Sequence, residues 1–133
     1  MQSRFNQNYV LKVTKPEIIQ KGWGQEVVIS NSGEYCGKIL QYNTGAVSSF
    51  HFHLSKRETW YVQSGEFYVI TTNPDTGAQI RLDLKKGDVL EIKPGMTHQV
   101  TCIVHGDIFE VSTPHYDYDT YRIAPGDSQT KYS

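Results

Sequence analysis

The stretch GAVSSFHFHLSKRETWYVQSG, residues 45–65, contains two histidines separated by one residue and a glutamate five residues after the second. Side chains alternate between the two faces of a β-strand, so His51 and His53 point to the same side and the flanking phenylalanines to the other. The turn that follows can bring Glu58 back beside both imidazoles. The stretch therefore predicts two strands whose polar side chains face one cavity.

A third histidine, His98, begins another expected strand directly after the Pro94-Gly95 turn. A lone His-x-His pair is more often surface or hydrogen-bonded histidine than a ligand pair, so the interpretation depends on the residues around it. Three imidazoles and one carboxylate suit one divalent ion such as Zn, Mn, Fe, Ni or Co, and four protein ligands leave positions for water or substrate. The predicted metal ligands are His51, His53, Glu58 and His98.

Length and charge limit the class of partner. A chain of 133 residues is sufficient for one domain with a buried core. Its 13 lysines and arginines nearly balance 14 aspartates and glutamates, and no basic cluster is longer than the two residues of Lys85-Lys86. No overall field attracts nucleic acid or an acidic membrane surface. We therefore expect a small-molecule partner, and no nucleic acid or membrane partner.

Two further observations concern the compartment. Cys36 and Cys102 are far apart in the sequence and match neither a disulfide framework nor a paired-thiolate zinc motif. The N-terminus lacks the apolar run of a signal peptide, and no stretch approaches the roughly 20 apolar residues of a membrane helix. We therefore expect a cytoplasmic protein.

Short segments rich in Val, Ile, Tyr, Phe and Thr alternate with turns containing Gly, Pro, Asn or Asp, which is typical of a sandwich or barrel. Such short connections favour antiparallel neighbours. Helix is nearly absent, apart from one weak turn expected at residues 16–20. The expected strands are 26–30, 35–43, 47–53, 58–63, 66–72, 78–84, 89–92, 98–104 and 107–112.

The spacing of these residues resembles that of a known family. Residues 45–65 fit G-x5-H-x-H-x4-E-x6-G, which is similar to the first motif of the cupin superfamily. Residues 94–98, PGMTH, resemble the end of the second motif, although the proline is one place late and Cys102 stands where the family usually has asparagine. The resemblance implies an all-β fold, the cupin antiparallel β-barrel (a jelly-roll-like double-stranded β-helix), with the same four metal ligands.

This resemblance covers most of residues 26–112. We therefore expect a single cupin domain over residues 1–133, with the barrel at about 26–112, an N-terminal arm at 1–25 and a C-terminal arm at 113–133. The C-terminal arm is polar and aromatic, so we expect it to pack over the barrel in an extended form.

Within the cupins, the chain looks like the type II mannose-6-phosphate isomerase domain. It departs from that pattern in having His51 where the family typically has glutamine and Ser55 where it has a further histidine. The nucleotidyltransferase domain that often accompanies that family is missing from this sequence. The matching features are KGWG at 21–24, Lys38 seven residues before Gly45, ETW at 58–60, VQSG at 62–65, EVS at 110–112 and the acidic segment ending in Tyr121-Arg122.

The narrower resemblance implies aldose–ketose isomerisation of a sugar or sugar phosphate, in which a proton moves between C1 and C2. We expect the base to be Glu110 or Lys38, and Arg122 to hold a phosphate as a bidentate cation. Each has a structural alternative. Lys38 could be solvated, Glu110 could orient a metal-bound imidazole, and Arg122 could pair with Asp117 or Asp119.

The remaining histidines and tryptophans are expected to have structural roles. His105 lies in an expected turn and His115 in the C-terminal arm, so both are interpreted as surface residues without a metal role. Trp23 and Trp60 are more often core residues than substrate platforms, although an aromatic wall would suit the apolar face of a sugar.

Other functions share this ligand set. Three histidines and a glutamate also suit an Fe-dependent dioxygenase, and a cupin without a working base would be a non-catalytic sugar or small-molecule binding module. A structural or storage barrel would have no need of four ligands. We also expect a homodimer, because the barrel leaves free edges and an outward face carrying Phe50, Phe52 and Tyr61.

Overall fold

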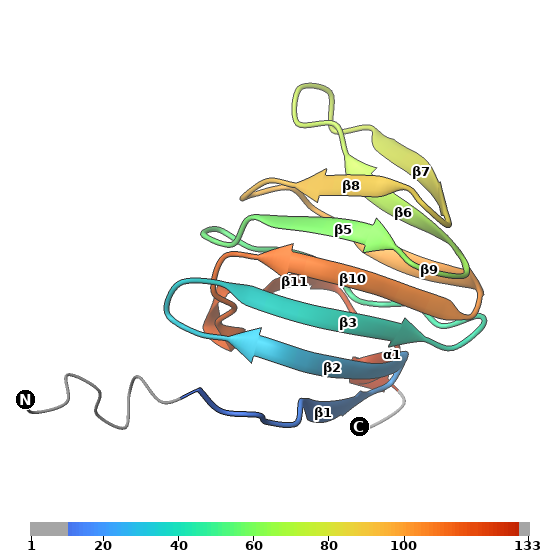
Figure 1. Ribbon diagram of the computed structural model, residues 1–133. Coiled ribbons are helices and arrows are strands. Elements are labelled where there is room, and N and C mark those ends of the chain that lie inside the picture. The colour runs from blue at the N-terminus through green and yellow to red at the C-terminus, as the bar shows by residue number, and fades with distance from the viewer. Residues whose placement is uncertain (1–10, 131–133) are drawn as a thin grey trace, which may run out of the picture.

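The computed structural model describes residues 11–130 and shows a chain built mainly of antiparallel β-strands (Figure 1). The ends of the two expected arms, residues 1–10 and 131–133, lie outside the described residues. No helix within residues 11–130 is long and apolar enough to cross a membrane. The elements are β1 (Glu17–Lys21), β2 (Gly24–Asn31), β3 (Cys36–Tyr42), β4 (Phe50–Phe52), β5 (Glu58–Val62), β6 (Glu66–Thr72), β7 (Gln79–Lys85), β8 (Val89–Ile92), β9 (Gln99–Val104), β10 (Gly106–Ser112), η2 (Asp117–Asp119), β11 (Tyr121–Ala124) and α1 (Asp127–Thr130).

The strands form two facing layers. Six of them make a sheet in the order β1-β2-β3-β10-β5-β8, and three make a sheet in the order β7-β6-β9. β4 pairs with β11, and isolated bridges from Val47 to Thr101 and from His51 to His98 join the β4 segment to the β9 segment. In Figure 1 the six-stranded sheet lies in front, with β6, β9 and β11 behind it. This confirms the all-β antiparallel barrel that the sequence predicted.

The inward side chains of β3, β10 and β5 change from apolar to polar along the strands. Leu40, Ile108 and Val62 are neighbours across these strands, and all three are buried. Two residues further along, Lys38 lies opposite Glu110, and both are equally buried. One end of the barrel is therefore a hydrophobic core, and the other end is polar.

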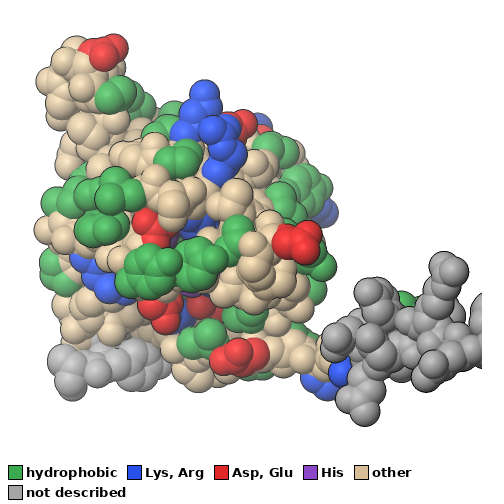
Figure 2. Space-filling view, turned by 90° about the vertical axis from the view of Figure 1, so that its left-hand side faces the viewer, with side chains coloured by type: hydrophobic (Ala, Val, Ile, Leu, Met, Phe, Trp, Pro, Cys, Tyr) green, Lys and Arg blue, Asp and Glu red, His purple; other side chains and the backbone are tan. Residues whose placement is uncertain are grey.

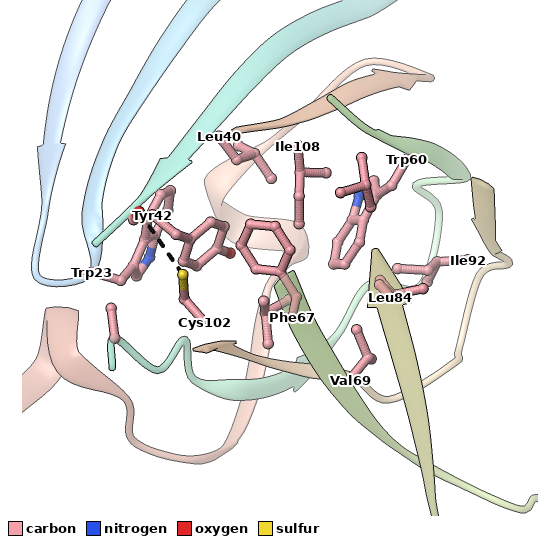
Figure 3. Close-up of a cluster of buried hydrophobic side chains, with 13 residues drawn as sticks. Trp23, Leu40, Tyr42, Trp60, Phe67, Val69, Leu84, Ile92, Cys102 and Ile108 are labelled. Atoms are coloured by element: carbon pink, nitrogen blue, oxygen red, sulfur yellow. Dashed lines mark hydrogen bonds between the residues drawn. The ribbon is translucent and has the colours of Figure 1, made fainter. Parts of the chain in front are cut away.

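Aromatic side chains fill much of the apolar end (Figure 3). Tyr42 stacks on Trp23 with ring centroids 4.2 Å apart and meets Phe67 edge-on at 5.6 Å. Such pairs stabilise a core by about 0.5–1.5 kcal/mol beyond the burial of their area. Trp23 and Trp60 are both buried, as the sequence predicted for core residues.

Three secondary-structure expectations were wrong. Residues 16–20 were expected to form a helical turn, but they fall largely within β1, because all five residues of that strand pair with β2. The strand expected at 47–53 is reduced to β4, since Val47 makes only an isolated bridge. β11 forms in the C-terminal arm, where no strand was expected, because β4 offers it a free edge.

Candidate metal site and cavity

Four predicted ligands come together at the polar end of the barrel. His51 lies on β4, His53 follows that strand, Glu58 begins β5 and His98 precedes β9. The main chains of His51 and His98 exchange two hydrogen bonds, N to O, of 3.1 and 2.8 Å. Gly95, with φ +84°, turns the chain before His98 and donates its N–H to the carbonyl of His53 at 2.6 Å. Main-chain pairing thus holds the three imidazoles together.

Each imidazole has its Nδ1 occupied by a main-chain carbonyl. Nδ1 lies 2.9 Å from Ser49 O in His51, 3.0 Å from Asp119 O in His53 and 3.0 Å from Met96 O in His98. A carbonyl oxygen only accepts, so a proton on each Nδ1 satisfies these contacts and leaves the lone pair of each Nε2 free. The hydroxyl of Ser49 also lies 2.9 Å from Nδ1 of His51.

The three imidazoles are close together, with His53 and His98 buried and His51 partly buried. Within residues 11–130, one ligand atom from each of the three histidines lies within 4.8 Å of the other two. Burial, with the charge of the neighbouring imidazoles, lowers the pKa of His51 to about 2. Burial also lowers the pKa of His98 to about 4 and that of His53 below its usual value. Neutral imidazoles at pH 7 are the form that binds metal.

Glu58 supplies an oxygen that lacks a partner. Its side chain is buried, and Oε1 accepts a hydrogen bond from Trp60 Nε1–H at 2.7 Å. Oε2 has no hydrogen-bond partner within residues 11–130, and it lies 3.4 Å from His53 Nε2 and 3.9 Å from His98 Nε2. Burial, with the charge of Glu110, raises the pKa of Glu58 to about 8.

A divalent cation would satisfy this arrangement. An unpaired buried carboxylate oxygen is costly, and positive charge beside it would offset that cost and keep the carboxylate ionised. The donor set of three imidazole nitrogens and one carboxylate oxygen suits Zn, Mn, Fe, Ni or Co. His51, His53 and His98 therefore lie close enough to hold one metal ion, with Glu58 beside them.

A cavity of about 330 Å³ opens beside these residues. Figure 2 views the end of the barrel where β3 and β5 begin, and acidic and basic side chains gather near the middle of this face. The volume is at the lower end of the range for small-molecule sites. The charged side chains that line the cavity are Lys21, Glu26, Lys38, Lys56, Glu58, Glu110, Asp117 and Arg122.

Two ion pairs lie on the cavity wall, one of them buried and the other partly buried. Lys56 Nζ is 2.8 Å from Glu110 Oε2, and Lys38 Nζ is 3.4 Å from Glu26 Oε2. Burial alone raises the pKa of Glu110, but the ammonium groups of Lys56 and Lys38 outweigh it and lower the pKa to about 2. Lys38 is therefore not the solvated strand residue that one interpretation allowed. Lys56 was not predicted from the sequence, because a lysine in a short turn carries no signal of burial.

The C-terminal arm also contributes to the cavity. Arg122 lines it from β11, directly opposite His51 in the strand register. Within residues 11–130, Arg122 forms no ion pair with Asp117 or Asp119. His115 was expected on the surface, but it is half-buried, lines the cavity and lies 3.1 Å from Lys56 Nζ. That expectation was wrong because the arm folds back across the mouth of the barrel.

Similar proteins agree with the barrel fold described above. A family model described as Cupin domain matches residues 38–111. Among solved structures, the oxalate decarboxylase of Bacillus subtilis at pH 4.6 is similar with a TM-score of 0.70 and 16% sequence identity, over 81% of this chain and 30% of that one. The capsular polysaccharide assembling protein CapF of Staphylococcus aureus has a TM-score of 0.71 and 18% identity, over 84% and 33%.

A third solved structure, a formate complex of the Lactobacillus farciminis oxalate decarboxylase, has a TM-score of 0.69 and 17% identity, over 81% of this chain and 34% of that one. The chain thus spans about a third of the length of these proteins. At such identities the similarity concerns the fold. No curated protein sequence matches this chain.

Proposed function

Because this chain belongs to the cupin domain family, we propose that it holds one divalent transition metal ion on His51, His53, Glu58 and His98 and acts there on a small, oxygen-rich molecule. The unpartnered Oε2 of Glu58, buried beside the Nε2 atoms of His53 and His98, is the observation that carries the proposal.

For the reaction, we propose aldose–ketose isomerisation of a sugar phosphate, similar to that of mannose-6-phosphate isomerases. When bound, a divalent metal supplies positive charge that stabilises negative charge developing on sugar oxygens. The chain's own residues must then move a proton from C2 to C1, while a second proton moves from the C2 oxygen to the C1 oxygen. Glu110 and Lys38 remain the candidate bases, since both line the cavity.

Arg122 is the proposed anion-binding group. It lies on β11 at the cavity, and its guanidinium has the planar geometry that pairs with two phosphate oxygens. Lys56 has a different proposed role. Its ammonium donates a hydrogen bond to Glu110 and would hold that carboxylate in place. Its positive charge would also favour the ionised form of Glu110, and so the release of a proton that Glu110 had accepted.

One observation favours a second candidate, a binding module without catalysis. Both candidate bases are held in ion pairs, Glu110 with Lys56 and Lys38 with the partly buried Glu26. A carboxylate whose pKa is lowered to about 2 is a weak base at pH 7, because general bases work best with a pKa near the operating pH. In this alternative the cavity holds a small sugar or acid and leaves it unchanged.

Hydrogen exchange distinguishes the two candidates. Mannose 6-phosphate and fructose 6-phosphate are incubated in D₂O with the metal-loaded protein, and exchange at C2 and C1 is followed by NMR. Isomerisation predicts deuterium incorporation that is lost in Glu110→Gln and kept in Asp107→Asn, a half-buried carboxylate outside the cavity. If no exchange occurs, and the sugar phosphates stabilise the metal-loaded protein against unfolding, the result would support the binding module instead.

We also propose a homodimer, through a different surface from the one expected. Phe50 and Phe52 lie on β4, where Phe52 stacks on Tyr121 of β11, whereas Tyr61 lies on the six-stranded sheet. The outer face of that sheet carries a row of apolar residues across all six strands. The row is Ile18, Val27, Ile39, Phe109, Tyr61 and Val89.

A second copy of this chain fits that face. Beside the apolar row, the amides of Gln20, Gln25 and Gln41 form a hydrogen-bonded row that ends at the carboxylate of Asp107. Two copies related by a twofold axis would therefore bring mainly uncharged groups together. Six strands about 4.8 Å apart and about 20 Å long present roughly 600 Å². A stable interface needs about 500 Å² from each partner. In Figure 1 no described element lies across this face.

A further inference from the structure

The four residues between two of the ligands, Leu54 to Arg57, form a tight loop between β4 and β5. The loop determines how His53 and Glu58 face each other, because they are its two flanking residues. It contains no proline or glycine that would fix its shape. Its conformation must therefore be imposed by contacts from elsewhere in the chain.

Asp119 supplies these contacts from η2, more than sixty residues away in the sequence. Its carboxylate accepts the N–H groups of Leu54 at 2.9 Å, Ser55 at 3.2 Å and Lys56 at 3.1 Å, and the hydroxyl of Ser55 at 2.7 Å. Three successive N–H groups directed at one carboxylate form an anion-binding nest. Asp119 is 4% exposed, so its carboxylate is buried against the loop.

The main chain of Asp119 makes a second contact with the site. Its carbonyl accepts the Nδ1–H of His53 at 3.0 Å, which fixes both the tautomer and the orientation of that ring. The same residue therefore holds the loop between two ligands with its side chain and aims one of those ligands with its carbonyl. The neighbouring Asp117 has an exposed side chain and contacts His115 rather than the loop.

We propose that Asp119 is a positioning residue for the metal site, so that the C-terminal arm sets the affinity of the barrel for its metal ion. The inference rests on the proposed metal site. Asp119 lies outside both stretches that supply the proposed ligands, residues 45–65 and 94–98. It also gives the arm a function: metal affinity depends on the docking of η2 against the β4–β5 loop.

The test compares Asp119→Asn with Asp117→Asn. Removal of a group that orients a ligand typically weakens metal binding by 10–100-fold. We expect the Kd for Co²⁺ or Zn²⁺, measured by competition with a chromophoric chelator, to rise at least tenfold in Asp119→Asn and less than twofold in Asp117→Asn. Ser55→Ala, which removes one hydrogen bond of the nest, should raise the Kd about two- to fivefold and serves if Asp119→Asn does not fold.

A variant in the core, remote from the site, tests whether a general loss of stability is enough to weaken metal binding. Val69→Ala, at a buried position of β6, should lower the unfolding midpoint and leave the metal Kd unchanged, whereas Asp119→Asn should change both. A folded Asp119→Asn, or Ser55→Ala in its place, with the wild-type Kd overturns the proposal.

A second readout separates this proposal from the metal site itself. In the metal-free protein, ¹⁵N NMR of the imidazoles should show that Asp119→Asn shifts or broadens the signals of His53 and leaves those of His98 unchanged. If the wild type binds no metal, the proposed metal site fails. An unchanged His53 signal in the variant then overturns the positioning role as well.

Discussion

The buried ion pair between Lys56 and Glu110 leads to a prediction about stability. The two side chains are 3% and 4% exposed, and their charged atoms are 2.8 Å apart. Removing one partner leaves a buried charge uncompensated, which costs about 3–5 kcal/mol. The fall of the Glu110 pKa from 4.5 to about 2 is the net effect of burial, which raises it, and of Lys56, Lys38 and Ser112, which lower it, with Lys56 the largest of the three; it corresponds to about 3 kcal/mol, at about 1.4 kcal/mol for each tenfold change in proton affinity.

The assay is a double-mutant cycle of Lys56→Met, Glu110→Gln and the double variant, measured by urea unfolding of the metal-free protein. We expect a coupling energy of about 3 kcal/mol. The exposed pair of Arg57 and Glu91, whose charged atoms are 3.1 Å apart, is the matched control and should give less than about 1 kcal/mol. A coupling for Lys56 and Glu110 no larger than that of the control would refute the reasoning.

The coupling should also depend on pH. The pKa of Glu110 is lower in the folded protein than in the unfolded chain, so its stabilisation is complete above about pH 4.5 and is lost as the pH falls toward 2. The difference in unfolding free energy between the wild type and Glu110→Gln should therefore shrink over that interval. A difference that grows as the pH falls would give the wrong sign.

Three further predictions concern the site, the core and the surface. Glu58→Gln should weaken metal binding at least 100-fold by calorimetry, yet leave the metal-free protein no less stable, because it removes a buried oxygen without a partner. Equal metal affinity would contradict this. Phe67→Ala should lower the free energy of unfolding by about 3–5 kcal/mol in urea, and a loss below about 1 kcal/mol would contradict the packing described. Phe109→Asp should halve the mass measured by light scattering and Asp107→Asn should not; a monomeric wild type would exclude the dimer.

The placing of the proposed ligands side by side could be predicted because it depends largely on local rules. Strand alternation places His51 and His53 on one face, and a short turn returns Glu58 to them. His98 required the resemblance to a family motif, since no local rule links residues 53 and 98. The structure explains the link through the main-chain bonds between His51 and His98.

The rest of the site could not be predicted, because it depends on contacts between distant segments. Lys56 becomes buried only when β10 places Glu110 beneath its turn. Asp119 reaches the β4–β5 loop, and His115 reaches the cavity, only because β11 pairs with β4 and brings the arm across the mouth of the barrel. A polar arm rich in tyrosine gives no sequence signal of that pairing. The sequence of β1 likewise gives no signal that it is a strand, because pairing with β2 decides its conformation.

The central claim is that His51, His53, Glu58 and His98 hold one metal ion. It is tested most directly by elemental analysis of untagged protein, as purified and after reloading, beside the double variant His51→Ala/His98→Ala. We predict about one transition metal ion per chain in the wild type and almost none in the folded variant. Equally low metal content in both proteins after reloading would contradict the claim.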